Sequence, residues 1–141
     1  MSVLPPLEEE FVTSGRLQVR VQPIAILGEE SELAAQAAEC AGEQGSFWQY
    51  GDALFASQAA GEIAISQDSL KRLAEGRVAD AAAFASCLDS GRYGAAVTAA
   101  TAEARGQGIN SVPATFVNGK KVPSTLDALR SAILDALAEA P

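Results

Sequence analysis

The sequence predicts an α/β fold in which a long helical block is inserted between two parts that contain strands. Residues 16–26, "RLQVRVQPIAI", alternate apolar and polar side chains, which is typical of a strand with one buried face. Residues 29–107 carry apolar side chains at helical spacing instead. Residues 113–122 then predict a hairpin, and an amphipathic helix follows it. The expected order is therefore helix end, strand, helical block, hairpin and helix.

Composition bounds the class of protein. The chain has 141 residues, 48% of them apolar and 20% charged, which is enough to bury the core of one domain. Its net charge is −8 and its basic residues are scattered, so nucleic acid and anionic membranes are poor partners. We expect no export signal and no membrane span, and a cytoplasmic protein if Met1 is the true start.

The chain contains no histidine, which removes the usual general base and the Ser-His and Cys-His nucleophile pairs. The acidic clusters Glu8-Glu9-Glu10 and Glu29-Glu30 lack the alternating ligands and central glycine of a calcium loop. We therefore predict no metal site and no cofactor, and interpret both clusters as solvated surface.

The N-terminal half shows where helices start and stop. Residues 5–14 resemble the end of a helix, with Gly15 after its last turn. Pro23 argues that the strand at 16–26 ends or lies at an edge. Within the helical block, glycines predict breaks at 42–45, 61, 76 and 91, and Ser66 is a candidate N-cap. The expected core positions here are Leu33, Ala37, Cys40, Ala41, Phe47, Trp48, Leu54 and Phe55.

The C-terminal part begins with "GINSVPATFVNG", residues 108–119. The bond between Val112 and Pro113 can adopt the cis form at low cost, which suits a sharply shaped loop. Asn118-Gly119 between two apolar runs is a strong hairpin signal. Ser124 or Thr125 would cap the last helix, whose core-facing residues are Leu126, Leu129, Ile133 and Leu137.

This order of elements, with three motifs, resembles the DsbA-like thioredoxin-fold family of thiol–disulfide oxidoreductases. The motifs are "AAQAAECAGEQGSFWQYGDALFA" and "FASCLDSGRY", which are similar to the family's helical insert, and "GINSVPATFVNG", which is similar to its cis-proline loop. The resemblance implies a single domain over residues 1–141. Residues 1–27 and 108–141 would form the thioredoxin core, and residues 28–107 the insert.

The sequence also departs from the family. Members carry a central strand and then Cys-x-x-Cys at the start of a helix, before a segment like residues 3–19, and no Cys-x-x-Cys occurs in these 141 residues. Gly51 stands where relatives often have histidine, and Ser111-Val112 replaces the commoner Gly-Thr. Dithiol exchange needs a thiolate, which a helix N-terminus favours. Cys40 and Cys87 are expected inside helices on apolar faces, so we assign them no catalytic role.

The resemblance assigns roles to four residues. Val112, before the cis Pro113, would offer its backbone to an extended substrate peptide, although Pro113 could also be only a structural turn. Cys40 and Cys87 would form a structural disulfide in an oxidising compartment, or remain two buried free thiols elsewhere. Phe47, Trp48, Tyr50 and Phe55 are expected to be packing residues rather than a binding patch.

Without the central first strand, two strand edges would face each other unpaired. Unpaired edges recruit partners. We expect residues 16–26 to pair directly with the hairpin, or a second copy to fill the gap in a homodimer.

Three functional interpretations remain open. The chain is a DsbA-like family member, truncated or degenerate, that is redox-inactive because it lacks Cys-x-x-Cys. Alternatively, it is a non-catalytic module that binds peptides or assembles through the cis-proline loop and the exposed edges. A third interpretation makes the Cys40 and Cys87 pair a redox sensor. The expected partner is an extended polypeptide, and family members usually act outside the cytoplasm.

Overall fold

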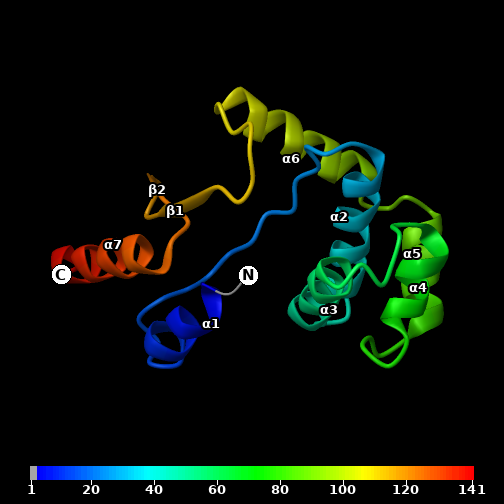
Figure 1. Ribbon diagram of the computed structural model, residues 1–141, viewed down its shortest axis with the longest axis horizontal. Coiled ribbons are helices and arrows are strands. Elements are labelled where there is room, and N and C mark those ends of the chain that lie inside the picture. The colour runs from blue at the N-terminus through cyan, green and yellow to red at the C-terminus, as the bar shows by residue number, and fades with distance from the viewer. Residues whose placement is uncertain (1–2) are drawn as a thin grey trace. The chain divides into compact units, whose positions relative to one another are not determined.

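A computed structural model describes residues 3–141 (Figure 1). The chain divides into two compact units. The part up to Val21, together with residues 111–141, is called the terminal unit, and residues 22–110 are called the helical unit. That both units belong to one domain, with the boundaries expected from the sequence, stays a prediction.

The terminal unit consists of short N-terminal helices, a hairpin and a long final helix. Helix α1 (Leu4–Leu7) continues as a π-helical segment η1 (Glu8–Val12), which confirms the predicted helix end. Strands β1 (Thr115–Val117) and β2 (Lys120–Val122) pair antiparallel around the Asn118-Gly119 turn, as predicted. Helix α7 (Leu126–Glu139) is capped by Thr125, whose side chain accepts a hydrogen bond from the Ala128 N–H.

The core of the terminal unit lies between the N-terminal helices, the hairpin and α7. Its four buried side chains are Leu7, Phe11, Leu129 and Ile133, with Val117, Val122, Leu126 and Leu137 packed against them. Glu10 Oε2 also accepts a hydrogen bond of 2.8 Å from Arg130 Nε. The predicted core face of the final helix is thereby confirmed.

The predicted strand at residues 16–26 is wrong, because those residues form no strand. In the described residues the only sheet is the pair β1–β2, so the expected direct pairing with the hairpin is also absent. A strand needs a hydrogen-bonded neighbour, and none lies alongside this segment. Leu17 and Val19 are nevertheless half-buried while Gln18 and Arg20 are exposed, but Val21 is 46% exposed, so burial follows the sequence pattern only over residues 17–20.

The helical unit contains five helices: α2 (Glu29–Gly42), α3 (Phe47–Ala59), α4 (Gln67–Ala74), α5 (Ala81–Asp89) and α6 (Gly94–Gly106). The predicted glycine breaks are confirmed. Ser66 caps α4 through a reciprocal pair of hydrogen bonds with Ser69, as expected for a capping box. In Figure 1, α2 and α3 lie next to the green pair α4 and α5.

The core of the helical unit is built mainly from α2, α3, α4 and α5 around two aromatic rings. Tyr50 and Phe84 are fully buried, with ring centroids 5.2 Å apart. The other buried members are Ala37, Cys40, Ala41, Leu54, Leu70, Leu73, Ala74, Cys87 and Leu88. Two expected core residues are wrong: Trp48 is 43% exposed and Phe55 is 61% exposed. They lie on the opposite face of α3 from Tyr50 and Leu54.

Candidate functional site

The predicted substrate loop comes directly before β1. The Val112–Pro113 peptide bond is cis, and Ser111, Val112 and Pro113 are all exposed. Among the described residues, neither the Val112 N–H nor its C=O takes part in a hydrogen bond. The loop therefore presents free backbone groups at the start of a strand.

Side-chain hydrogen bonds from β1 and from the residue before Thr125 fix this loop. Thr115 Oγ1 and Ser124 Oγ lie 2.6 Å apart, and Ser124 Oγ donates to the Pro113 carbonyl at 3.4 Å. β1 pairs with β2 on one edge, and its other edge has no strand beside it in the described residues. An extended peptide could add there through main-chain hydrogen bonds, with Val112 at the entrance.

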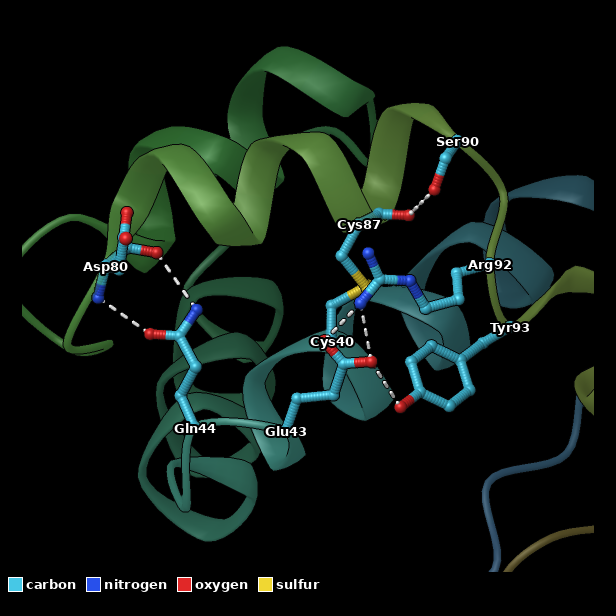
Figure 2. Close-up of a disulfide and its surroundings, with 8 residues drawn as sticks. All are labelled: Cys40, Glu43, Gln44, Asp80, Cys87, Ser90, Arg92 and Tyr93. Carbon is cyan, nitrogen blue, oxygen red and sulfur yellow. Dashed lines mark hydrogen bonds and ion pairs between the residues drawn. A yellow bond between two sulfur atoms is a disulfide. The ribbon is translucent and has the colours of Figure 1, made fainter.

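The two cysteines lie elsewhere, in the core of the helical unit. Cys40 on α2 and Cys87 on α5 form a disulfide between residues 47 positions apart, and each residue is 1% exposed (Figure 2). Both sit within helices rather than at helix N-termini. Dithiol exchange requires an accessible sulfur, so this buried pair is a poor site for it.

Polar contacts join the same two helices beside the disulfide (Figure 2). Arg92 donates to both carboxylate oxygens of Glu43, at 2.7 and 2.8 Å, and the Tyr93 hydroxyl donates to Glu43 Oε1 at 2.8 Å. These bonds, first from Arg92 and then from Tyr93, lower the pKa of Glu43. The same contact raises the pKa of Arg92 and of Tyr93.

After the disulfide and the Glu43 contact, a third connection joins the end of α2 to the start of α5, between Gln44 and the N-cap residue Asp80. Gln44 Nε2 donates to the Asp80 carbonyl at 2.9 Å, and the Asp80 N–H donates to Gln44 Oε1 at 2.7 Å. Asp80 also caps α5 through the Ala83 N–H. Glu43 follows α2 directly, and Arg92 and Tyr93 follow α5. The two sequence motifs that contain the cysteines therefore also contain the residues of the Glu43 contact.

No group of three or more Asp, Glu, Cys or His within residues 3–141 is arranged to hold a metal ion. None of the helices in the described part of the chain is long and apolar enough to cross a membrane.

The fold and these motifs agree with known proteins. The model of the thioredoxin family matches residues 1–135, so the chain belongs to the thioredoxin family. Its similarity to two proteins named disulfide bond formation protein D shows that its thioredoxin fold is of the DsbA-like kind, which has a helical insert. Over 138 residues it is 28% identical to the probable disulfide bond formation protein D of Bacillus anthracis and 27% identical to that of Bacillus cereus.

A third relative has a different name. The chain is 32% identical over 140 residues to the Na⁺/H⁺ antiporter NhaA 3 of Salinispora tropica. These matches cover 94 to 96% of this chain, but 64% of each disulfide bond formation protein and 21% of the antiporter. The chain therefore spans less than two thirds of the curated relatives it matches.

Proposed function

We propose that this chain is the polypeptide-holding part of a disulfide-forming system, and that its 141 residues do not carry out dithiol exchange by themselves. The observation behind the proposal is that the cis-proline loop leads into a strand with one unpaired edge, while both cysteines are buried. Two of its three reported relatives are named for disulfide bond formation, which makes a polypeptide the natural class of ligand.

The holding role belongs to Val112 and the edge of β1. Val112 is 47% exposed, and its backbone groups have no hydrogen-bond partner among residues 3–141. It comes shortly before β1, whose second edge would pair with an added strand. Main-chain bonding supplies affinity for many sequences, and the β-branched Val112 side chain narrows the choice by contacting the neighbouring residue of the peptide. Cys40 and Cys87 would only stabilise the helical unit.

A second candidate is assembly of two copies through the same edges. It is favoured by the segment at residues 18–24, whose backbone N–H groups make no hydrogen bond within the described residues, and by the free edge of β1. Unpaired backbone of this kind is a template for another chain. A homodimer would then occupy the edge that a peptide would otherwise use.

The first test is insulin reduction by the 141-residue chain with dithiothreitol as reductant. We expect a rate equal to that of dithiothreitol alone. Reduction that exceeds this rate and disappears in Cys87→Ser would contradict the proposal and support the redox-sensor interpretation.

The second test measures peptide binding by amide chemical shifts in NMR. A short, reduced, extended peptide should shift the signals of residues 111–116 most strongly, while signals of α4 stay in place. Sedimentation equilibrium, run on the same samples, distinguishes the second candidate. A dimer that dissociates as peptide is added would show that both use one edge, and a peptide that shifts nothing at residues 111–116 would exclude the holding role.

A further inference from the structure

The outward face of α3 is an aromatic surface that the core does not use. Tyr50 and Leu54 point into the core, whereas Trp48 and Phe55 are exposed. Trp48 and Phe55 are seven positions apart, so they lie nearly in line and about 10 Å apart along the helix axis. Large aromatic side chains bury much apolar area on contact, so two of them exposed on one helix face make that face a candidate contact surface.

A carboxylate lies between the two rings. Asp52 is four residues after Trp48 and three before Phe55, which makes it a neighbour of both, with Cβ atoms about 5–6 Å apart. Asp52 is exposed and forms no ion pair within residues 3–141. We call Trp48, Asp52 and Phe55 the α3 aromatic face.

Neighbouring side chains order the α3 aromatic face. Phe47 meets Trp48 edge to face, with ring centroids 5.6 Å apart and an interplanar angle of 86°. On the buried side, the Tyr50 hydroxyl donates to the Leu70 carbonyl at 3.1 Å and so fixes α3 against α4. A surface that is already ordered loses little entropy when it binds.

The helical unit that carries this face has an excess of negative charge. The helical unit contains twelve Asp and Glu residues but five Lys and Arg, and α3 itself contains no basic residue. A cation over an aromatic ring gains from the ring's quadrupole, and more so beside a carboxylate. The complementary ligand therefore carries positive charge.

We propose that the α3 aromatic face binds arginine or lysine side chains of a partner polypeptide that also carries apolar residues. Two rings about 10 Å apart favour a polypeptide over a small cation, because one chain can place a cationic side chain and an apolar side chain on the face at the same time. One cationic side chain would lie between the rings against Asp52, and its apolar neighbour would cover Phe55. The inference goes beyond the proposed function, since it requires neither Val112 nor cysteine chemistry.

The test uses the emission of Trp48, which is the sole tryptophan of the chain. The probe is a short cysteine-free peptide in which arginine, leucine and serine alternate, compared with a twin that has glutamine at each arginine. The arginine peptide should shift Trp48 emission in a saturable, salt-sensitive manner, and the glutamine twin should bind at least about fivefold more weakly.

Substitutions assign the effect to the face. Asp52→Asn should weaken binding about two- to fivefold, and Phe55→Ser by a similar factor. Glu75→Gln, which removes one exposed carboxylate of the same unit that is not on α3, should leave the affinity unchanged. All three positions are exposed, so the variants should keep the parent's circular dichroism and melting temperature.

Equal binding of the two peptides, or equal affinity of Asp52→Asn and Glu75→Gln, would overturn the inference. So would peptide binding, detected by calorimetry, that leaves Trp48 emission unchanged. The peptide-holding loop is monitored separately by the NMR signals of residues 111–116, so failure at one surface is distinguishable from failure at the other.

Discussion

The Glu43 carboxylate and the Arg92 guanidinium meet beside the disulfide that joins Cys40 to Cys87, with Arg92 Nη1 2.7 Å from Glu43 Oε2. Glu43 lies three residues after one cysteine and Arg92 five residues after the other, so both links join the same helices, α2 and α5. The disulfide is covalent and buried, whereas the ion pair is exposed. Their contributions to stability should therefore differ in size and in their response to conditions.

The double variant Cys40→Ala/Cys87→Ala should lower the free energy of unfolding by about 4 kcal/mol, because the crosslink no longer restricts the unfolded chain. Urea denaturation followed by circular dichroism measures this loss. The parent chain, with its disulfide kept reduced by dithiothreitol, should show a similar loss relative to its oxidised form. An unchanged urea midpoint would show that the disulfide contributes nothing.

The Glu43 contact should make stability depend on acid. Hydrogen bonds from Arg92 and Tyr93 lower the pKa of Glu43 in the folded protein, so the stabilisation is fully present above its ordinary value of 4.5. It is lost as the pH falls through the lowered folded-state pKa. The parent should therefore have a higher urea midpoint than Glu43→Gln at pH 7, and the gap should close toward pH 3. A constant gap would contradict this origin.

The two tyrosines should resist ionisation at alkaline pH. The hydrogen bond to Glu43 raises the pKa of Tyr93, and burial raises the pKa of Tyr50 more strongly. Both groups favour the neutral phenol, so their stabilisation is present below pH 10 and is lost as the pH rises through the folded-state values. Phenolate absorbance at pH 10 should thus be well under half of its maximum.

Glu43→Gln provides the control for this titration. It should return Tyr93 toward its ordinary pKa and increase phenolate absorbance at pH 10, while Tyr50 remains neutral. Unfolding in urea should return the pKa of both tyrosines to its ordinary value. Identical curves for the parent and Glu43→Gln would show that the Glu43 contact does not form in solution.

Sequence patterns predicted the parts of this fold that depend on local signals. Glycine breaks located the five helices of the helical unit, and Asn118-Gly119 located the hairpin. Ser66 was predicted as a cap, and Thr125 was one of two candidates for the last cap. These features are decided within a few residues, by capping hydrogen bonds and turn geometry. The cysteine and proline motifs were identified instead through their resemblance to the DsbA-like family.

The failures involve tertiary context. Residues 16–26 alternate correctly for a strand, but a strand also requires a neighbour, which a local pattern does not reveal. Trp48 and Phe55 were predicted to be core residues of the helical block and are exposed. Their spacing from Tyr50 and Leu54 carried a signal that could have corrected this, since it puts the two pairs on opposite faces of one helix.

The terminal unit allows a matched comparison of neighbouring residues on α7. Ile133 is 4% exposed and contacts the buried cluster, whereas Leu134 is 46% exposed. Ile133→Ala should lower the free energy of unfolding by about 2–5 kcal/mol. Leu134→Ala should change it by no more than about 0.5 kcal/mol. Urea denaturation measures both. Similar losses in the two variants would mean that α7 packs in a different rotation.

The last prediction concerns residues 22–27, which have no secondary structure but are attached to α6. The Thr101 hydroxyl accepts a hydrogen bond of 2.9 Å from the Ala25 N–H and donates one of 2.8 Å to the Val97 carbonyl. Thr101→Val keeps the shape of this buried side chain but leaves the Ala25 N–H without its acceptor, which should cost about 1–3 kcal/mol. Hydrogen exchange at Ala25 should accelerate accordingly.

Thr98→Val is the matched control, since Thr98 lies one turn earlier on α6 and is exposed. It should leave exchange at Ala25 unchanged. If both variants accelerate Ala25 equally, the effect comes from α6 as a whole. If neither does, the 22–27 segment is held by its half-buried Pro23, Ile24 and Ile26 side chains rather than by Thr101.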